Sequence, residues 1–533
     1  MILSRYNSLF ALALLSLLLF MPGIAKLPVI DRDEAHFAQA TRQMLQSGNY
    51  FQIRFQEKTR FQKPPGINWL QAGSVKLFSD ADSTDIWPYR VPSTLGALLA
   101  VIFTWWFSKR FISSKAAITA AVMLAACLLL VIEAHMAVID ASLLFSVLLM
   151  QGSLWIVYQA SMEGRKAHWG WAFAFWLAMS YGFLLKGVTP LVGLLTIAAL
   201  CGSERSFKWV SGLRPLGGVA LFAGINMLWL ALVNHAEHSN YLLQMINKDL
   251  LPKLQGGHES HGKPPLFHLF ILPLTFWPAS LFLWPAAEYA WKNRNLAVVR
   301  FLLAWLIPTW LFFECMPTKL PQYILPLLPA LAILSALAVQ DGAKPGRFLH
   351  FLQILWGILS IGLAAAIVTS FYQMTGTLDW ASRGLLAAAV ILTVLTVKQA
   401  WKGQYNQAFK LSTALGIIVF AITFNQLLPA MKPVWLTRNV AELVKNHNNQ
   451  LLTVVGFEEP SLVFNLNTEQ VRFTDADNAY KALSGGNALG LFDANSFESA
   501  RQRYPSLNVV AKTRGFNYSK GRWVDLLLVN SQV

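Results

Sequence analysis

Long blocks of apolar residues, separated by short polar stretches, run along this sequence to about residue 430. A helix needs about 20 apolar residues to cross the hydrocarbon core of a bilayer, and many of these blocks reach roughly that length. The pattern predicts an α-helical polytopic membrane protein with about thirteen transmembrane helices. The expected spans lie near residues 8–26, 91–107, 116–133, 141–160, 169–184, 187–203, 214–234, 266–286, 297–315, 320–338, 351–371, 384–400 and 411–430.

Lysine and arginine are divided unequally between the two sets of alternate loops. Cytoplasmic loops of membrane proteins are enriched in these residues. The bias predicts a cytoplasmic N-terminus and a C-terminus on the opposite, outer side. One set of short loops holds fifteen, namely Lys109, Arg110, Lys115, Arg165, Lys166, Arg205, Lys208, Arg214, Lys292, Arg294, Lys344, Arg347, Lys398, Lys402 and Lys410, and the other set holds three, namely Lys186, Lys319 and Arg383.

The first apolar segment allows a second interpretation. Arg5, the apolar run after it, Gly23 and Ala25 resemble a signal peptide with its cleavage site. Cleavage would leave twelve spans in the same orientation.

Two loops on the predicted outer face are long, residues 27–90 and 235–265. The first contains two amphipathic helical stretches, one beginning near Asp33 and one running from Pro64-Pro65 to Phe78. Such helices can lie flat on a membrane surface. We therefore expect a transmembrane domain, residues 1–430, that carries structured loops on its outer face.

The composition changes after about residue 431, where polar and apolar residues mix. Short β-like runs occur at 451–456, 471–474, 488–492 and 523–529, and helical stretches at 436–447 and 495–503 alternate with them. Residues 431–533 are therefore expected to form a small α/β domain on the outer side.

Composition agrees with a membrane protein. Hydrophobic residues make up 55% of the 533 residues and charged residues only 13%, against about 25% charged in soluble domains. The net charge of +16 reflects basic cytoplasmic loops rather than nucleic-acid binding. The three cysteines, Cys127, Cys201 and Cys315, lie in apolar segments without a CxxC spacing, so they indicate packing residues and not a zinc or disulfide framework.

Acidic residues at two helix starts share the predicted outer face. Asp33-Glu34 follows the first span, and Asp140 opens the fourth. Adjacent carboxylates at a helix start are often only partners of the helix dipole. Ionisable groups near membrane depth are costly and usually mark a function, which makes Asp140 the stronger signal of the two.

Several lysines also lie on the side that the charge bias keeps poor in lysine. They are Lys63, Lys186, Lys263 and Lys319, the last within Thr318-Lys319-Leu320-Pro321-Gln322-Tyr323. A single one would be explained as a snorkelling side chain at a helix end. A group of cations at one surface suits a ligand that carries phosphate.

The second long outer loop contains His258 and His261, three residues apart with Glu259 between them. This spacing could bind a divalent metal ion. A solvated polar turn is the alternative interpretation.

Five motifs in order, each on the predicted outer face, resemble glycosyltransferase family 39. They are Asp33-Glu34, Lys63-Pro64-Pro65, Asp140, Lys186-Gly187 and the segment from Thr318 to Tyr323. Within the family the sequence is similar to bacterial aminoarabinose transferases of lipid A and their undecaprenyl-phosphate-dependent relatives. The resemblance covers residues 1–335 well, and the remainder matches in arrangement more than in residues.

The resemblance implies a GT-C fold in the bacterial inner membrane, a polyprenyl-phosphate-linked sugar donor, and a lipid A or other envelope acceptor on the periplasmic face. It implies a catalytic carboxylate at Asp33, with Glu34 beside it and Asp140 assisting or orienting the acceptor. It places the donor phosphate near Lys63, Lys263 and Tyr323, with Lys186 and Lys319 as further substrate-binding cations. Direct displacement would invert the anomeric carbon.

This sequence departs from the aminoarabinose pattern at three positions. Gln62 stands where those enzymes have the Glu that binds a metal together with two His, so a site at His258 and His261 would need Glu259 or Glu57 in its place. His36 replaces an Arg, and Gln322 replaces a His. These changes suggest a different sugar or acceptor.

Two other functions stay open at this stage. One is a protein O-mannosyltransferase-like activity, which would differ only in the acceptor. The other is a transporter or flippase of lipid-linked sugars, a class that often shows internal repeats and ionisable residues at mid-membrane. We find no convincing repeat, and the polar residues gather at one face.

Overall fold

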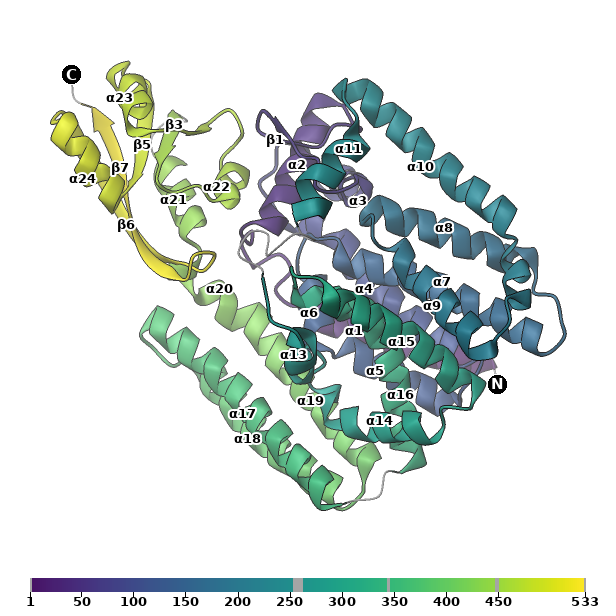
Figure 1. Ribbon diagram of the computed structural model, residues 1–533. Helices are drawn as coiled ribbons and strands as arrows, with labels where there is room; N and C mark the ends of the chain where they lie inside the picture. The colour runs from purple at the N-terminus through teal and green to yellow at the C-terminus, as the bar shows by residue number, and fades with distance from the viewer. Residues whose placement is uncertain (1, 253–261, 343–345, 446–449, 532–533) are drawn as a thin grey trace.

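The computed structural model describes residues 2–252, 262–342, 346–445 and 450–531. It comprises a large bundle of apolar helices and a small sheet domain at the C-terminus (Figure 1). The bundle and its outer loops contain α1 (Ile2–Phe20), α2 (Asp33–Ser47), β1 (Arg54–Phe55), β2 (Lys58–Thr59), α3 (Gly66–Phe78), α4 (Trp87–Ser108), α5 (Ser114–Ala125), α6 (Leu128–Ala134), α7 (Asp140–Met162), α8 (Trp169–Leu185), α9 (Pro190–Glu204), α10 (Pro215–Glu237), α11 (Tyr241–Met245), α13 (Phe267–Thr275), α14 (Leu283–Lys292), α15 (Ala297–Cys315), η5 (Pro321–Leu327), α16 (Leu328–Asp341), α17 (Arg347–Thr375), α18 (Trp380–Trp401), α19 (Tyr405–Ile422) and α20 (Leu428–Ala430).

Each predicted apolar span coincides with a helix or with a pair of helices joined at a bend. Among the described residues, eight helices are long and apolar enough to cross a membrane, or up to ten if each bent pair is one span. Three shorter apolar helices, Asn7–Phe20, Trp169–Leu185 and Pro190–Glu204, account for the remaining predictions. The polytopic class is confirmed, and the count of thirteen crossings stays a prediction.

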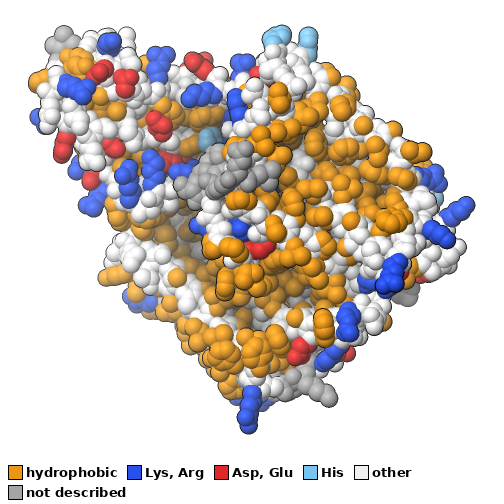
Figure 2. Space-filling view, in the orientation of Figure 1, with side chains coloured by type: hydrophobic (Ala, Val, Ile, Leu, Met, Phe, Trp, Pro, Cys, Tyr) orange, Lys and Arg blue, Asp and Glu red, His pale blue; other side chains and the backbone are white. Residues whose placement is uncertain are grey.

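Lipid must cover much of this bundle. Only 22% of the apolar stretch of α10 and 33% of that of α17 is buried by protein, so their exposed side chains need an apolar solvent. Figure 2 shows hydrophobic side chains spread over the helical part, with Lys and Arg side chains along its lower right edge. The chain is therefore a multi-pass membrane protein.

The two bent pairs satisfy one another's backbone at their breaks. α5 and α6 meet at 60°, and α13 and α14 meet at 115°. At the first break the amide of Leu128 donates to the carbonyl of Trp277 at 2.8 Å, and the Cys127 thiol donates to the carbonyl of Thr275 at 2.9 Å. Non-helical backbone is tolerated at membrane depth only when protein satisfies it, and these contacts provide that.

The C-terminal domain is a five-stranded mixed sheet with helices, as far as the structure describes it. The strand order is β4-β3-β5-β7-β6, with β3 parallel to β4 and β5, and β7 antiparallel to β5 and β6. Four strands and two helices lie where the sequence predicts them, whereas β6, α22 and α23 are additional. The elements are η7 (Lys432–Val434), α21 (Leu436–Lys445), β3 (Leu451–Val455), α22 (Pro460–Asn465), β4 (Val471–Phe473), α23 (Ala476–Ser484), β5 (Ala488–Asp493), α24 (Ala494–Arg503), β6 (Leu507–Asn517) and β7 (Arg522–Ser531).

Candidate active site

The acidic motif begins α2, directly after the loop that follows α1. Asp33 is the first residue of the helix and is exposed. The residue before it, Arg32, has φ 69° and ψ −100°, a left-handed backbone region that side chains other than glycine rarely adopt. Such a conformation costs on the order of 1–3 kcal/mol and persists only where the surroundings enforce it. The loop that presents Asp33 is therefore under backbone strain.

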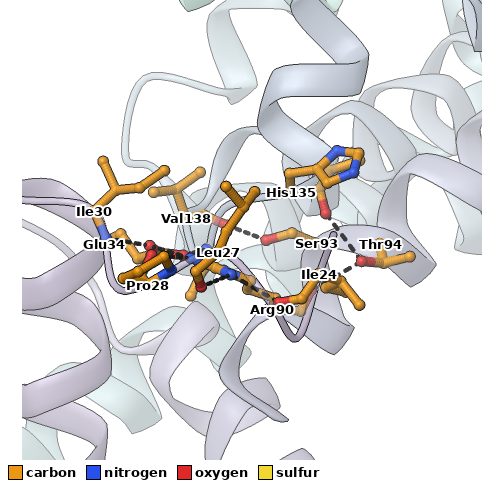
Figure 3. Close-up of polar contacts among 12 residues, drawn as sticks. Ile24, Leu27, Pro28, Ile30, Glu34, Arg90, Ser93, Thr94, His135 and Val138 are labelled. Carbon is orange, nitrogen blue, oxygen red and sulfur yellow. Dashed lines mark hydrogen bonds and ion pairs between the residues drawn. The ribbon is translucent and has the colours of Figure 1, made fainter. Parts of the chain in front are cut away.

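Glu34, the neighbour of Asp33, is fully buried in an ion pair with Arg90 of α4 (Figure 3). The Arg90 guanidinium donates to Oε1 and Oε2 of Glu34 at 2.8 and 2.9 Å. It also donates to the carbonyls of Ile24, Leu27 and Pro28 at 2.7–2.8 Å. Arg90 thus holds the acidic loop on one side and Glu34 on the other.

The same carboxylate also accepts two backbone amides. Ile30 donates to Oε2 at 2.7 Å, and Ala137 donates to Oε1 at 2.7 Å. Ala137 lies in the loop that leads to Asp140 at the start of α7, so Glu34 joins the two segments that carry acidic residues. Each oxygen of Glu34 already accepts two hydrogen bonds, and we propose that it positions the loop rather than contacting substrate, which revises the catalytic role predicted for it.

Asp140, Lys186 and Tyr323 come together as the sequence predicts, from three different helix ends. The Lys186 ammonium donates to Oδ1 of Asp140 at 2.9 Å and lies 4.8 Å from the centre of the Tyr323 ring. All three line a cavity that Gln322, Phe313 and Thr189 also line. Burial alone would lower the pKa of Lys186, but the charge of Asp140 and the neighbouring Tyr323 raise it overall, so the lysine stays a cation.

A third carboxylate, Glu133 at the end of α6, faces this cluster. Its side chain is 6% exposed, and its Oε2 has no hydrogen-bond partner among the described residues. It interacts electrostatically with Asp140, Lys186 and Asp33. Glu133 is therefore within electrostatic reach of both the exposed Asp33 and the Asp140–Lys186 pair.

The glycine after Lys63-Pro64-Pro65 places this motif beside the cluster. A Cβ on Gly66 would lie 2.5 Å from the carbonyl oxygen of Leu184, two residues before Lys186, so only glycine permits this approach of α3 to α8. The Lys63 ammonium contacts both oxygens of Asp249 at 3.1 Å. Lys63 therefore lies at the same outer edge as Lys186, held by a carboxylate from the second long loop.

The side chain of Lys319 is linked to the backbone of Lys263. The buried Lys319 ammonium donates to the carbonyl of Lys263 at 3.1 Å, and Gly262 pairs with Thr318 in an isolated bridge. The Lys263 side chain remains exposed. Lys319 thus ties down the end of the second long loop, and Lys263 is the cation that this loop presents.

The predicted metal ligands His258 and His261, with Glu259, lie outside the described residues. Within the described ranges no group of three or more His, Cys, Asp or Glu side chains could hold a metal ion. Gln62 is a neutral amide whose buried Oε1 lacks a partner among those residues. A divalent metal at this loop therefore stays a prediction.

Three features of the site were missed by the sequence interpretation. Arg90 was left as the last residue of the first long outer loop, and Glu133 as an ordinary residue at the end of a predicted span, although an ionisable residue at membrane depth is itself a signal of function. Burial lowers the pKa of His36 to about 3, and the charge of the nearby Arg60 contributes to this shift. His36 is therefore neutral, and Arg60 supplies the cation beside Asp33's helix.

The environment of Asp31, the residue before Arg32, predicts that the stability of the protein depends on pH. Burial raises the pKa of Asp31 from 3.8 to about 7, and its neighbours are Ser461, Glu459, Arg32 and Tyr518. A raised carboxyl pKa means that the contribution to stability is complete below 3.8 and is lost as the pH rises through about 7. We expect thermal unfolding in detergent to show a loss of about 3 kcal/mol between pH 5 and pH 8, and the variant Asp31→Asn to lack that loss. Equal pH profiles for both proteins would contradict this assignment.

Comparison with known proteins finds similar sequences among glycosyltransferases. The family described as dolichyl-phosphate-mannose-protein mannosyltransferase matches residues 62–229. Two curated proteins of Pseudomonas fluorescens are named undecaprenyl phosphate-alpha-4-amino-4-deoxy-L-arabinose arabinosyl transferase 1 and 2. The first is 27% identical over 64% of this chain and 61% of its own length, less than two thirds. The second is 24% identical over 94% of this chain and 89% of its own length.

Solved structures agree on the fold. ArnT from Cupriavidus metallidurans bound to undecaprenyl phosphate superposes with a TM-score of 0.77 at 18% identity, covering 98% of each chain. The oligosaccharyltransferase AglB from Archaeoglobus fulgidus gives a TM-score of 0.51 at 11% identity over 97% of this chain and 73% of AglB. These matches confirm the fold and the family resemblance predicted from the sequence.

Proposed function

We infer that this chain, a GT-C glycosyltransferase similar to the aminoarabinose transferases, transfers a sugar from a polyprenyl-phosphate donor to lipid A or another envelope acceptor. We place the reaction at the periplasmic face of the bacterial inner membrane, with the N-terminus in the cytoplasm and the C-terminus in the periplasm. The observation that carries the proposal is the cavity where Asp140, Lys186 and Tyr323 meet; Glu133 interacts electrostatically with this cluster and with Asp33.

The cations of the site suit the leaving group. When the bond between the sugar and the donor phosphate breaks, the electron pair leaves with the polyprenyl phosphate as an anion, which needs positive charge more than an acid. Lys186 is held as a cation at the cavity. Lys63 and Lys263 lie at the outer edge, and we assign these three lysines to the donor phosphate.

The carboxylates suit the acceptor. Asp33 is exposed at a fixed helix start, where it can accept the proton of an acceptor hydroxyl while the acceptor oxygen bonds to the anomeric carbon. Asp140 stays paired with Lys186, which fits a role in orienting substrate. Attack opposite to the departing phosphate would invert the anomeric carbon.

The substitution at Gln322 bears on specificity because this side chain lines the cavity. A neutral amide there offers hydrogen bonds of both kinds without the ionisable ring of histidine. We therefore expect a sugar or acceptor other than that of the aminoarabinose enzymes. A protein acceptor is the second candidate, since the mannosyltransferase family matches residues 62–229.

The proposal is tested with purified protein in lipid nanodiscs and a lipid extract from the producing strain. We expect release of free undecaprenyl phosphate together with a sugar-bearing lipid product. Release of the carrier with a glycosylated protein would favour the second candidate. If the donor is not consumed, both the lipid acceptor and the protein acceptor are contradicted.

We predict that replacement of Lys63 by Gln weakens binding of the donor. We expect the variant to bind undecaprenyl phosphate about tenfold more weakly, since a charge-assisted hydrogen bond contributes about 1.5–3 kcal/mol. The matched control is Lys58→Gln, an exposed lysine in β2 of the same loop, which should bind like wild type. Binding by microscale thermophoresis distinguishes the two, and equal affinity of Lys63→Gln and wild type would remove Lys63 from the site.

A further inference from the structure

The C-terminal domain reaches the acidic loop directly. The carboxylate of Asp31 accepts a hydrogen bond from the backbone amide of Ser461 at 3.0 Å, and the Asp31 amide donates to the Tyr518 hydroxyl at 2.5 Å. Ser461 lies in α22, and Tyr518 lies in the turn between β6 and β7. Both contacts fall one residue before the strained Arg32 and two before Asp33.

Further contacts join the C-terminal domain to the helices beside the acidic loop. Phe464 of α22 is fully buried and packs edge-on against Tyr89, with ring centres 5.4 Å apart. Arg42 of α2 donates to the carbonyl of Phe464 at 3.1 Å. α22 of the sheet domain therefore packs against α2, the helix that Asp33 begins.

The turn that carries Tyr518 is itself anchored. Asn517, its neighbour, donates to the buried carboxylate of Glu459 at 2.8 Å. The Tyr518 ring faces Trp435 with centres 6.4 Å apart. The hydroxyl that receives the Asp31 amide is therefore fixed in place, and Figure 1 shows the β6–β7 turn lying between the sheet domain and the helices.

We infer that Tyr518 is a positioning residue for the transfer reaction, acting through the backbone of Asp31 on the catalytic carboxylate Asp33. Two clamps then hold the strained loop. Arg90 and Glu34 hold its inner side, and the C-terminal domain holds its outer side. This inference rests on the proposed function, because it assumes that Asp33 takes part in sugar transfer.

Loss of the Tyr518 hydroxyl should affect turnover but not binding of the donor. The partly buried Asp31 amide would lose its acceptor, so the backbone at Arg32 would relax toward an unstrained conformation and turn Asp33 away. The lysines assigned to the donor phosphate belong to other elements and would not move. Turnover should fall while affinity for the donor phosphate stays the same.

The experiment compares Tyr518→Phe with Tyr504→Phe in the full-length protein. Tyr504 belongs to the same domain and donates to Asp477 at 3.0 Å, away from the acidic loop. For Tyr518→Phe we expect about a tenfold lower rate of lipid modification, less than the roughly 10²-fold that a 1 Å misplacement of a catalytic group can cost, with unchanged binding of undecaprenyl phosphate. Tyr504→Phe should match wild type in both measurements.

A second variant separates positioning from general damage. Arg32→Gly removes the backbone strain, so the loop needs the outer clamp less. In an Arg32→Gly background, Tyr518→Phe should lower the rate only about twofold, whereas a loss of tenfold again would overturn the inference. A wild-type rate for Tyr518→Phe alone would also overturn it, while absence of transfer by the wild type would instead overturn the proposed function.

Discussion

Replacement of Asp33 by Asn is expected to leave almost no sugar transfer while the protein still folds and binds its donor. General-base catalysis contributes about 10²–10⁴-fold, so we expect the rate to fall by about 10³-fold. Asp33 is exposed and makes no contribution to the buried Glu34–Arg90 pair, which is why stability should not change. Rates with purified protein, and binding of undecaprenyl phosphate, measure the two effects separately.

Asp85→Asn is the control for this experiment. Asp85 is an exposed carboxylate in the same outer loop, before α4, and its exchange changes the net charge by the same amount. The control should retain wild-type turnover. Full activity of Asp33→Asn, or an equal loss in both variants, would remove the catalytic role from Asp33.

Replacement of Arg90 by Met should destabilise the whole outer half of the protein. It leaves the Glu34 carboxylate buried without its cation and leaves three backbone carbonyls without their donor. Breaking one partner of a buried ion pair costs about 3–5 kcal/mol. Thermal unfolding in detergent should show this loss, together with loss of transfer.

Two further variants check the cause of that loss. In Glu34→Gln with Arg90→Met the buried charge is gone, so part of the stability should return although the carbonyls stay unpaired. Arg383→Met removes an exposed arginine that lies over Trp380 and should change stability by no more than about 0.5 kcal/mol. A loss below 1 kcal/mol for Arg90→Met would contradict the clamp.

The positions of the spans could be predicted because lipid imposes a length and a composition on any helix that crosses it. The breaks within two spans could not, since α5–α6 and α13–α14 read as continuous apolar runs. What permits their bends is the pairing of Leu128 and Cys127 with carbonyls about 150 residues later in the chain. Such a contact leaves no local pattern.

The site shows the same division. Asp140, Lys186 and Tyr323 could be grouped because topology places all three at one face, and they do share a cavity. Asp33 and Glu34 are neighbours in sequence, yet one is exposed and the other buried, because adjacent residues on a helix point about 100° apart. Arg90, the ion-pair partner of the buried Glu34, lies on another helix and could not be identified from spacing.

In the C-terminal domain, β6 escaped prediction for a physical reason as well. It lies at the edge of the sheet, and its exposed side chains between Asn508 and Arg514 mix apolar Val509 and Val510 with polar Asn508, Lys512 and Arg514. An edge strand that shows charge to solvent lacks the apolar alternation of an inner strand. The strand nevertheless leads into the turn that presents Tyr518.

Mass spectrometry of envelope lipids tests the central claim most directly. Lipids are compared from a strain that lacks this gene and from the same strain complemented with wild type or with Asp33→Asn. We predict one lipid species that gains a fixed sugar mass only with wild type, accompanied by accumulation of the polyprenyl-phosphate sugar in the other two strains. Identical lipids and identical donor levels in all three strains would contradict transfer from a lipid phosphate at this site.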